Sequence, residues 1–302
     1  IRDQPRSRWL GDVYKRQSKR PVWDTFPGAW FTKAADVIMP NGRTLQVATY
    51  HHYKDQWAEA FDLTFEDPDG NTKPCHQTTF GMSERLLGAV VGMHGDDYGL
   101  VMPPSIAPIQ IVIMPIAQHV NPNVLTSVYE LDEQLRSAGF RVHVDDRDLR
   151  PGAKHFDWEI KGVPLRVEIG PRDLESKSSL VSARTGGKQQ IALDGFVDSA
   201  QQLLETISSE LRSRAKKVAD GLVCAFPGFI KDENGNSVLK EPIQDGLIYE
   251  LAFDGSDSDA EALEKSTGLT LLGDADMPFP DPVPCAITGN PTTRRQHIAR
   301  MY

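Results

Sequence analysis

Between residues 109 and 218, apolar runs typical of strands alternate with segments whose apolar residues recur at helical spacing. The apolar runs IQIVIMPI and VPLRVEIG, and the shorter FRVHVDD and SLVSAR, predict strands. Apolar residues at helical spacing predict an amphipathic helix in NVLTSVYELDEQLRSAG that ends at Gly139, a short helix in AKHFDWEIKG and a long helix over about 196–218. This alternation of strands and helices indicates a three-layer α/β unit with a largely parallel sheet.

Residues 18 to about 104 instead indicate a β-rich domain. DVIMP and RTLQVATYHH predict two strands joined through Asn41 and Gly42, a dipeptide typical of tight hairpins. AEAFDLTFEDPDGNTKPCHQTTFG predicts a strand, an acidic loop and a second strand that leads into a helix over about 83–93. The apolar stripe of that helix is expected to comprise Leu86, Val90 and Met93, with Leu87 and Val91 beside it.

The last part of the chain, from about residue 219, is less regular. Eight acidic residues lie between positions 251 and 281, with only Lys265 to oppose them, and five prolines lie within 277–291. We therefore predict a small appended α/β domain at 216–302, after the β-rich domain at 18–106 and the α/β domain at 107–215.

The composition places the chain among soluble globular proteins. Its 302 residues, 39% of them hydrophobic, suffice for two or three cores, and no apolar run approaches the roughly 20 residues of a membrane span. The cysteines Cys75, Cys224 and Cys285 are too widely separated for a disulfide framework or a paired metal motif, which favours a reducing, cytoplasmic setting. The net charge of −9 argues against indiscriminate binding to nucleic acid, but it leaves room for a local RNA site.

The first 17 residues, IRDQPRSRWLGDVYKRQ, differ in pattern from the rest of the chain. Their DVYKRQ matches one reading frame of the transposon mosaic-end adapter used in sequencing libraries. We expect residues 1–17 to derive from that adapter, with a disordered basic arm as the alternative, and the chain to be the later part of a longer protein.

Four segments resemble, in order, prolyl-tRNA synthetases of the archaeal and eukaryotic-like type. They are FPGAWFTKAADVIMPNGRTLQVATYHH, TTFGMSERLLGAVVGMHGDDYGLVMPP, DDRDLRPGAKHFDWEIKGVPLRVEIGPRD and the terminal RMY. The resemblance implies the end of a class II catalytic domain, built on an antiparallel sheet, at 18–106. It implies an anticodon-binding domain at 107–215 and the family's C-terminal domain at 216–302, without the first two class II motifs.

Arg85 stands in the first turn of the predicted helix, where a cation opposes the helix dipole. The segment alone is explained more simply as an exposed arginine at a helix end. The resemblance implies instead that Arg85 is the catalytic arginine of the third class II motif and binds ATP, with Ser83 beside it. A guanidinium suits that role because it binds phosphate oxygens in pairs and neutralises developing charge.

The resemblance also assigns Gln46 and Thr49 to ATP and His51 to proline. On a regular strand, residues 49 and 51 share a face and residue 46 lies on the other, so their convergence requires a bulge or a bend. A partly buried strand pair is the alternative for His51 and His52. Tyr50 stands where serine is usual, and YKDQW replaces the common LGQNF, which could alter the substrate pocket.

Six residues near the ends of the α/β-domain strands are candidates for reading the anticodon. Open α/β sheets bind ligands there, and single-stranded bases are recognised by hydrogen bonds at their exposed edges. Arginine and lysine suit guanine acceptors, whereas a glutamate accepts from base amino groups; for Glu159 and Arg166, a simple pairing within the fold is the alternative. The candidates are Arg147, Lys154, Glu159, Lys161, Arg166 and Arg172.

The C-terminal domain of this family often holds zinc with four cysteines. Here Cys285 begins CAIT, and residues 240–265 contain no cysteine. One thiolate cannot form a tetrahedral structural site, so we expect no zinc and no other protein-bound metal. The resemblance further implies that the carboxylate of Tyr302 reaches toward the active site, a frayed terminus being the alternative.

The resemblance therefore implies ATP- and Mg²⁺-dependent ligation of proline to its transfer RNA, tRNA(Pro), through prolyl-adenylate, with a homodimer for the full-length protein. We expect the 302 residues alone to be unable to form prolyl-adenylate. The alternative is a catalytically inert paralogue that binds tRNA through the anticodon-binding domain, supported by the altered TYHHYKDQW segment. A purely structural or regulatory relative is disfavoured by the intact GMSER and KGVPLRVEIGPRD segments.

Overall fold

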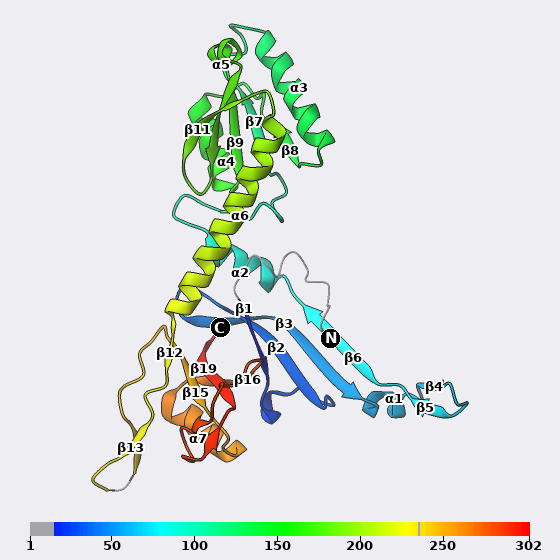
Figure 1. The fold of residues 1–302 in the computed structure, drawn as a ribbon, viewed down its shortest axis with the longest axis vertical. Coiled ribbons are helices and arrows are strands. Elements are labelled where there is room, and N and C mark those ends of the chain that lie inside the picture. The colour runs from blue at the N-terminus through cyan, green and yellow to red at the C-terminus, as the bar shows by residue number, and fades with distance from the viewer. Residues whose placement is uncertain (1–14, 235) are drawn as a thin grey trace. The chain divides into compact units, whose positions relative to one another are not determined.

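The computed structural model describes residues 15–234 and 236–302 (Figure 1). Two compact units are present among these residues: one is 90–215, and the other joins 15–89 to 216–302. Of the segment expected as one domain at 18–106, residues 18–89 share a unit with residues 216–302, whereas residues 90–106 belong to the other unit. Most of the adapter-like segment, residues 1–14, lies outside the described residues, whereas Arg16 and Gln17 take part in β1 (Lys15–Lys19).

The unit of residues 90–215 is built on a five-stranded sheet in the order β11-β10-β9-β7-β8. Strand β7 runs parallel to β8 and β9, whereas β10 is antiparallel to both β9 and β11, so the sheet is mixed rather than largely parallel. The turn at Gly186 and Gly187, whose φ angles are 115° and 90°, lets β11 return beside β10 as a hairpin. The strands are β7 (Ile111–Pro115), β8 (Val142–Val144), β9 (Leu165–Ile169), β10 (Ser178–Ala183) and β11 (Lys188–Ala192).

Helices cover both faces of this sheet, which confirms the predicted three-layer α/β fold. Ile111 and Ile113 belong to a core with apolar residues of α3 and α6, whereas Val112 and Met114 pack with Trp158 of α4. Successive residues of a strand point to opposite faces, so α3 and α6 lie on one side and α4 on the other. The helices are α3 (Asn123–Ser137), α4 (Pro151–Ile160), α5 (Pro171–Ser176) and α6 (Phe196–Gly221).

The other unit is built on an eight-stranded sheet in the order β12-β15-β19-β16-β1-β2-β3-β6. Strand β1 is antiparallel to both β2 and β16, and the end of β19 runs parallel to the start of β3. The C-terminal segment therefore extends this sheet and does not pack as a separate small sheet. Besides β1, the strands are β2 (Phe31–Ile38), β3 (Arg43–Lys54), β6 (Gln77–Met82), β12 (Val223–Ala225), β15 (Ile248–Ala252), β16 (Thr270–Ala275) and β19 (Arg295–Met301).

The predicted β2–β3 hairpin is confirmed. Gly42 has a φ of 74°, and its N–H donates to the carbonyl oxygen of Met39 at 2.8 Å. A Cβ at Gly42 would lie 1.8 Å from the carbonyl oxygen of Gly246, so this turn also accommodates a close backbone approach.

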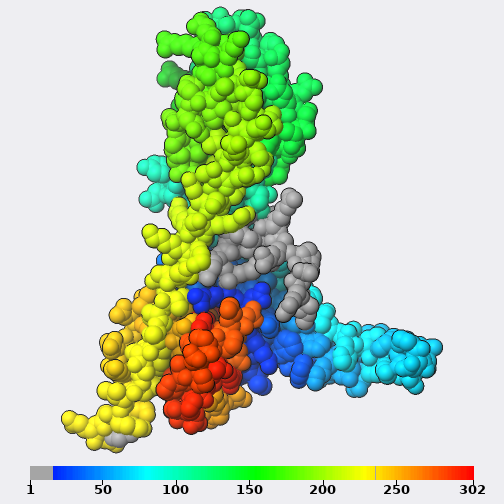
Figure 2. Space-filling model, in the orientation of Figure 1, coloured from blue at the N-terminus to red at the C-terminus, as the bar shows by residue number. Residues whose placement is uncertain are grey.

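Smaller elements surround the eight-stranded sheet. The β4–β5 and β13–β14 hairpins project from the rest of their unit (Figures 1 and 2). Helix α7 begins at a capping box in which Ser256 Oγ accepts from the Asp259 N–H at 3.3 Å. These elements are η2 (Val22–Asp24), α1 (Gln56–Ala60), β4 (Thr64–Glu66), β5 (Thr72–Pro74), β13 (Phe229–Lys231), β14 (Ser237–Leu239), α7 (Asp257–Thr267), β17 (Val283–Pro284) and β18 (Pro291–Thr292).

Helix α2 (Arg85–His94) follows β6, as the sequence predicts. Leu86, Val90 and Met93 are buried, which confirms the predicted stripe. Leu87 and Val91 are 43% and 38% exposed, so the expectation that they widen the stripe is wrong. The stripe is completed by Ala89, which is fully buried, because a small residue allows close packing on that face.

Candidate nucleotide site and anticodon-binding surface

Three of the residues assigned to ATP and proline, Gln46, Thr49 and His51, line one cavity of about 390 Å³ in the unit formed by residues 15–89 and 216–302. All three are half-buried and belong to β3. The other lining residues come from the segment before β2 and from β2 itself; they are Arg20, Trp23, Asp24, Thr25, Phe26, Pro27 and Thr32.

A bulge in β3 explains how these three side chains meet. Across the hairpin, Asp36 pairs with Gln46 and Ala35 pairs with Ala48, which leaves Val47 as an extra residue in β3. An extra residue of this kind reverses the alternation of faces on one side of the bulge. Gln46 therefore lies on the cavity face of the sheet, although regular alternation along the strand would place it on the opposite face from Thr49 and His51.

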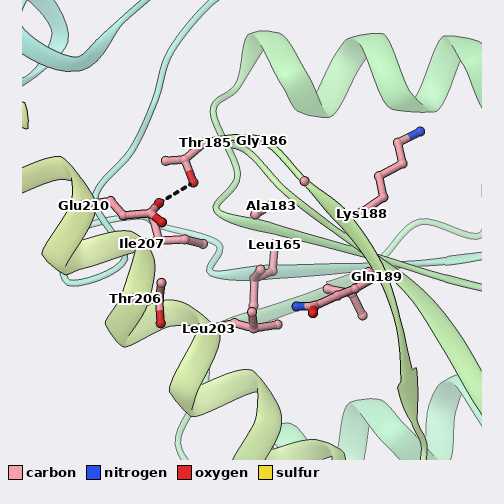
Figure 3. Close-up of a pocket in the computed structure, with 12 residues that line it drawn as sticks. Leu165, Ala183, Thr185, Gly186, Lys188, Gln189, Leu203, Thr206, Ile207 and Glu210 are labelled. Atoms are coloured by element: carbon pink, nitrogen blue, oxygen red, sulfur yellow. Dashed lines mark hydrogen bonds between the residues drawn. The ribbon is translucent and has the colours of Figure 1, made fainter.

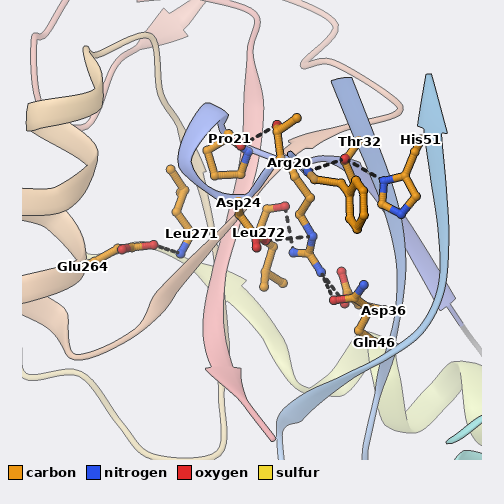
Figure 4. Close-up of polar contacts among 12 residues, drawn as sticks. Arg20, Pro21, Asp24, Thr32, Asp36, Gln46, His51, Glu264, Leu271 and Leu272 are labelled. Atoms are coloured by element: carbon orange, nitrogen blue, oxygen red, sulfur yellow. Dashed lines mark hydrogen bonds and ion pairs between the residues drawn. The ribbon is translucent and has the colours of Figure 1, made fainter. Parts of the chain in front are cut away.

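His51 is held at the wall of the cavity. Its Nδ1 lies 2.9 Å from Thr32 Oγ1, and its ring centroid lies 4.9 Å from that of Phe26. Partial burial lowers the pKa of His51, which favours the neutral imidazole at pH 7. Figure 4 shows the hydrogen bond between Thr32 and His51. A neutral ring beside an aromatic side chain suits a small ligand with an apolar portion.

Thr49 lies opposite Gly81 in the β3–β6 ladder. A Cβ at Gly81 would lie 3.2 Å from Thr49 Oγ1, closer than most such contacts, so glycine leaves space for the hydroxyl. Strand β6 then leads into α2, which places Ser83 and Arg85 beyond the end of this pairing.

Ser83 and Arg85 lie outside the lining residues of the cavity. Both are exposed, and Ser83 Oγ accepts a 3.4 Å hydrogen bond from the backbone N–H of Arg85. Within the described residues, no acidic side chain forms a salt bridge with Arg85, so its guanidinium is available to an anion at the start of α2.

Arg20 also lines the cavity, although the sequence did not predict it as a site residue. The side chain is almost fully buried, and its Nη2 donates to Asp36 Oδ1 at 2.8 Å (Figure 4). Burial raises the pKa of Asp36, and the guanidinium of Arg20 opposes that shift. The only local signal was SKRP, a basic run that is normally read as a solvent-exposed segment.

The unusual Tyr50 does not line the cavity. Its ring centroid lies 4.7 Å from that of Phe80 and 5.6 Å from that of Phe31. Two residues of the altered YKDQW stretch, Tyr53 and Trp57, line an adjoining cavity that shares Phe26 with the first. Tyr50, Tyr53 and Trp57 therefore lie near the cavity of Gln46, Thr49 and His51 and not in its wall.

Tyr302 is held at the β2–β3 hairpin. Its N–H donates to the carbonyl oxygen of Thr44 at 3.1 Å, and its hydroxyl accepts from Asn41 Nδ2 at 2.8 Å. The guanidinium of Arg43 lies 5.7 Å from the centroid of the tyrosine ring. Tyr302 is thus tied to the start of β3 and does not line the cavity.

In the unit of residues 90–215, Arg147 is fixed by two carboxylates. Asp145 accepts from its Nε and Nη2, each at 2.8 Å, and Asp157 accepts from its Nη1 at 3.0 Å. The buried Asp145 carboxylate also accepts from Trp158 Nε1 at 2.7 Å. These donors hold the pKa of Asp145 well below its usual range, and the carboxylates raise the pKa of Arg147.

Two of the other candidates lie around the same tryptophan. Lys154 is only 3% exposed, and its Nζ donates to the backbone oxygen of Asp145 at 2.9 Å. Lys161 is exposed, with its Nζ 4.3 Å from the centroid of the Trp158 ring. Lys161 is therefore accessible to an RNA ligand, whereas Lys154 supports the fold at this point.

The remaining three candidates lie on different elements. Arg166, on β9, has a side chain only 15% exposed, with its Nε 3.9 Å from Glu168 Oε1. Glu159 is half-buried on α4, and Arg172 is exposed on α5. No hydrogen bond or ion pair among the described residues joins these three side chains to the group around Trp158.

A cavity of about 200 Å³ lies between the TGGK turn and α6 in this unit (Figure 3). Thr185 Oγ1 donates to Glu210 Oε2 across its edge at 3.1 Å. None of the predicted site residues lines it.

No group of three or more His, Cys, Asp or Glu side chains suited to a metal ion occurs in the described part of the chain. Cys285 is buried, and its Sγ accepts from the N–H groups of Asp254 and Thr288, each at 3.4 Å. Thr288 Oγ1 donates to Asp254 Oδ1 at 2.8 Å. Among residues 15–234 and 236–302, no helix has the length and apolar character that crossing a membrane requires.

Comparison with known proteins agrees with this arrangement. Residues 110–203 match the family model of the anticodon-binding domain. That domain, together with the relatives that follow, places the chain among the aminoacyl-tRNA synthetases.

The proline–tRNA ligase of Thermococcus kodakarensis is 42% identical over 266 residues, which are 87% of this chain and 53% of that protein. That of Methanococcoides burtonii is 40% identical over 299 residues, 96% of this chain and 61% of that protein. The structure of Giardia lamblia prolyl-tRNA synthetase in complex with prolyl-adenylate matches 97% of this chain and 63% of its own, with a TM-score of 0.85 and 27% identity. The chain belongs to the prolyl-tRNA synthetase family, and it spans between about half and three fifths of these curated relatives.

Proposed function

We propose that this chain supplies the later part of the adenylate-forming site and the anticodon-binding domain of an ATP-dependent proline–tRNA ligase. The observation that carries the proposal is the convergence of Gln46, Thr49 and His51 on one cavity through the β3 bulge. The Giardia lamblia relative, solved with prolyl-adenylate, supports the same ligand here.

The reaction needs placement and charge stabilisation. A carboxylate oxygen of proline attacks the α-phosphorus of ATP, the bond to pyrophosphate breaks, and a terminal hydroxyl of the tRNA then displaces AMP from the adenylate. Gln46 and Thr49 would hold the nucleotide, His51 and Phe26 would contact proline, and Arg85 would bind phosphate oxygens. Mg²⁺ would neutralise phosphate charge and be held chiefly by the phosphates and water, as is usual for this ion at phosphate sites.

The anticodon-binding domain would bring tRNA(Pro) to this site. Lys161, Arg172 and Arg147 are exposed basic candidates, and the guanidinium of Arg147 is held in place by Asp145 and Asp157. The homodimer expected of the full-length protein forms part of the same proposal.

Pyrophosphate exchange and tRNA charging test the proposal together. The chain would be assayed alone and after fusion to the first part of the Thermococcus kodakarensis relative. This chain covers only 53% of that relative, and the fusion supplies the part that it does not cover. The fusion is expected to catalyse proline-dependent ATP–pyrophosphate exchange and to charge tRNA(Pro). Arg85→Ala in the fusion should lower exchange by about 100-fold or more, while tRNA binding stays unchanged.

The catalytically inert paralogue predicts a different result. The fusion would then bind tRNA(Pro) but show no exchange with any amino acid. The position of Tyr50 outside the cavity wall supports the active ligase over this alternative. A fusion that folds and neither binds tRNA(Pro) nor exchanges pyrophosphate would overturn both.

A further inference from the structure

Arg20 connects four segments of its unit at the edge of the nucleotide cavity. Its Nη2 donates to Asp36 Oδ1 at 2.8 Å and to Gln46 Oε1 at 3.5 Å, and its Nη1 donates to the carbonyl oxygen of Leu272 at 3.1 Å. Its Nε lies 3.4 Å from Asp24 Oδ2. These partners belong to β2, β3, β16 and η2, so one side chain joins the cavity wall to the C-terminal segment.

The burial of this arginine is costly without its partners. The side chain is 1% exposed, and that of Asp36 is 3% exposed, so the ion pair is almost entirely removed from water. A buried charge persists only where an opposite charge and further hydrogen bonds compensate its lost hydration. A guanidinium has five N–H donors in a rigid plane, which suits it to several acceptors at once.

The contact with Gln46 determines which end of that amide meets the cavity. A primary amide has an acceptor oxygen and a donor nitrogen on the same carbon. Arg20 offers only donors, so it engages the oxygen, and no acceptor within the described residues engages Gln46 Nε2. The donor end is therefore left for a ligand.

We infer that Arg20 is a positioning residue that turns the Gln46 amide so that its N–H₂ group faces the bound nucleotide. The recognised feature is a hydrogen-bond acceptor of the nucleotide, an oxygen or a ring nitrogen. This inference rests on the proposed ATP-dependent function, because it assigns the cavity to a nucleotide. It also gives β16 a part in the site, since the Leu272 carbonyl holds the second guanidinium nitrogen.

The first test concerns the side chain alone and needs no ligand. In the ¹⁵N-labelled 302-residue chain, the side-chain amide signals of Gln46 would be assigned by their loss in Gln46→Met. Arg20→Lys keeps a charge beside Asp36, but a single ammonium cannot reproduce the guanidinium's contacts with Leu272 and Gln46. The amide signals of Gln46 are expected to shift toward those of an exposed glutamine in this variant, and unchanged signals in a folded Arg20→Lys chain would overturn the inference.

A double-mutant cycle then tests whether the orientation of the Gln46 amide affects the binding of ATP. In the fusion with the first part of the Thermococcus kodakarensis relative, Arg20→Lys and Gln46→Met should each raise the KM for ATP about tenfold, the loss expected for one hydrogen bond of about 1.4 kcal/mol. The double variant should be no worse than either single variant, with kcat and the KM for proline nearly unchanged. Additive losses, or equal losses for ATP and proline, would show that Arg20 does not act through Gln46.

Two further variants separate this role from folding. Lys33→Met removes an exposed ion pair with Asp276 in the same sheet and should leave every readout unchanged. If Arg20→Lys does not fold, Arg20→Met combined with Asp36→Leu removes both buried charges and should show the same shift in Gln46 signals. If the fusion shows no exchange but the Gln46 signals shift as expected, the proposed function fails while the positioning by Arg20 stands.

Discussion

The carboxylate of Asp145 holds the guanidinium of Arg147 through two hydrogen bonds of 2.8 Å. Asp145 itself is fully buried. Because the pKa of Asp145 is lowered in the folded protein, its contribution to stability is fully present above its ordinary pKa of about 4. That contribution is lost as the pH falls further. We expect the urea concentration at the unfolding midpoint of this unit to decrease when the pH is lowered below about 4. The indole N–H signal of Trp158 would monitor this unfolding.

Asp145→Asn provides the matched comparison. The variant should lose about 2–3 kcal/mol near neutral pH, because charge-assisted hydrogen bonds are replaced by weaker ones. Its acid dependence should also be flatter than that of the unmodified chain. Equal slopes for the two proteins below about pH 4 would assign the acid dependence to another carboxylate.

Lys161 and Lys154 should respond differently to substitution. Lys161→Met should weaken binding of a tRNA(Pro) transcript several-fold and reduce its salt dependence, because an exposed cation is lost. Lys154→Met should chiefly lower stability, because the backbone oxygen of Asp145 loses its buried donor. Filter binding at several salt concentrations, with thermal unfolding in parallel, measures both effects. Lys188→Met, another exposed lysine of the unit, is the control, and an equal loss of binding there would remove the special role of Lys161.

Gly81→Ala tests the space around Thr49. The added methyl would crowd the Thr49 hydroxyl at 3.2 Å, while alanine loses less conformational freedom than glycine on folding. We expect the KM for ATP to rise in the fusion with little or no loss of stability. Gly88→Ala is the control, because a Cβ there meets nothing within 4 Å. Equal KM values for both variants would exclude Gly81 from the site.

Metal should have no effect on the stability of the C-terminal segment. The Sγ of Cys285 already accepts two backbone N–H groups, so it forms part of a hydrogen-bonded structure with Asp254 and Thr288. EDTA or added Zn²⁺ is expected to change the Tm by less than about 1 °C, whereas a structural zinc site would contribute several kcal/mol to folding. Cys285→Ala should be destabilising with or without metal, because both N–H groups lose their acceptor. A fall in Tm on chelation would contradict the expectation of no zinc.

The elements of the α/β unit could be predicted because their signals are local. The helix at 123–137 and the strand at 111–115 each carry their own apolar period, and the layers follow from that alternation. The return of β10 as an antiparallel strand was missed, because the pattern of SLVSAR does not reveal its direction. The end of β19, which runs beside the start of β3, was missed for a similar reason: pairing between distant segments leaves no local period.

The candidate site was predicted only in part. The resemblance assigned Gln46, Thr49 and His51, but the bulged Val47 that unites them leaves no mark in the hydrophobic pattern. Arg20 was overlooked because the partners that stabilise its burial, Asp36 and the Leu272 carbonyl, are remote in sequence.

The sheet that joins β3 to β19 has a consequence for synthesis on the ribosome. Its first strands emerge early, but their neighbours β16 and β19 follow only after the whole of residues 90–215. The unit of residues 90–215 is a continuous stretch of the described chain, so it can fold while the other unit still has unpaired strands. Nascent chains arrested before β16 should show a protease-resistant anticodon-binding unit and an exposed, aggregation-prone remainder.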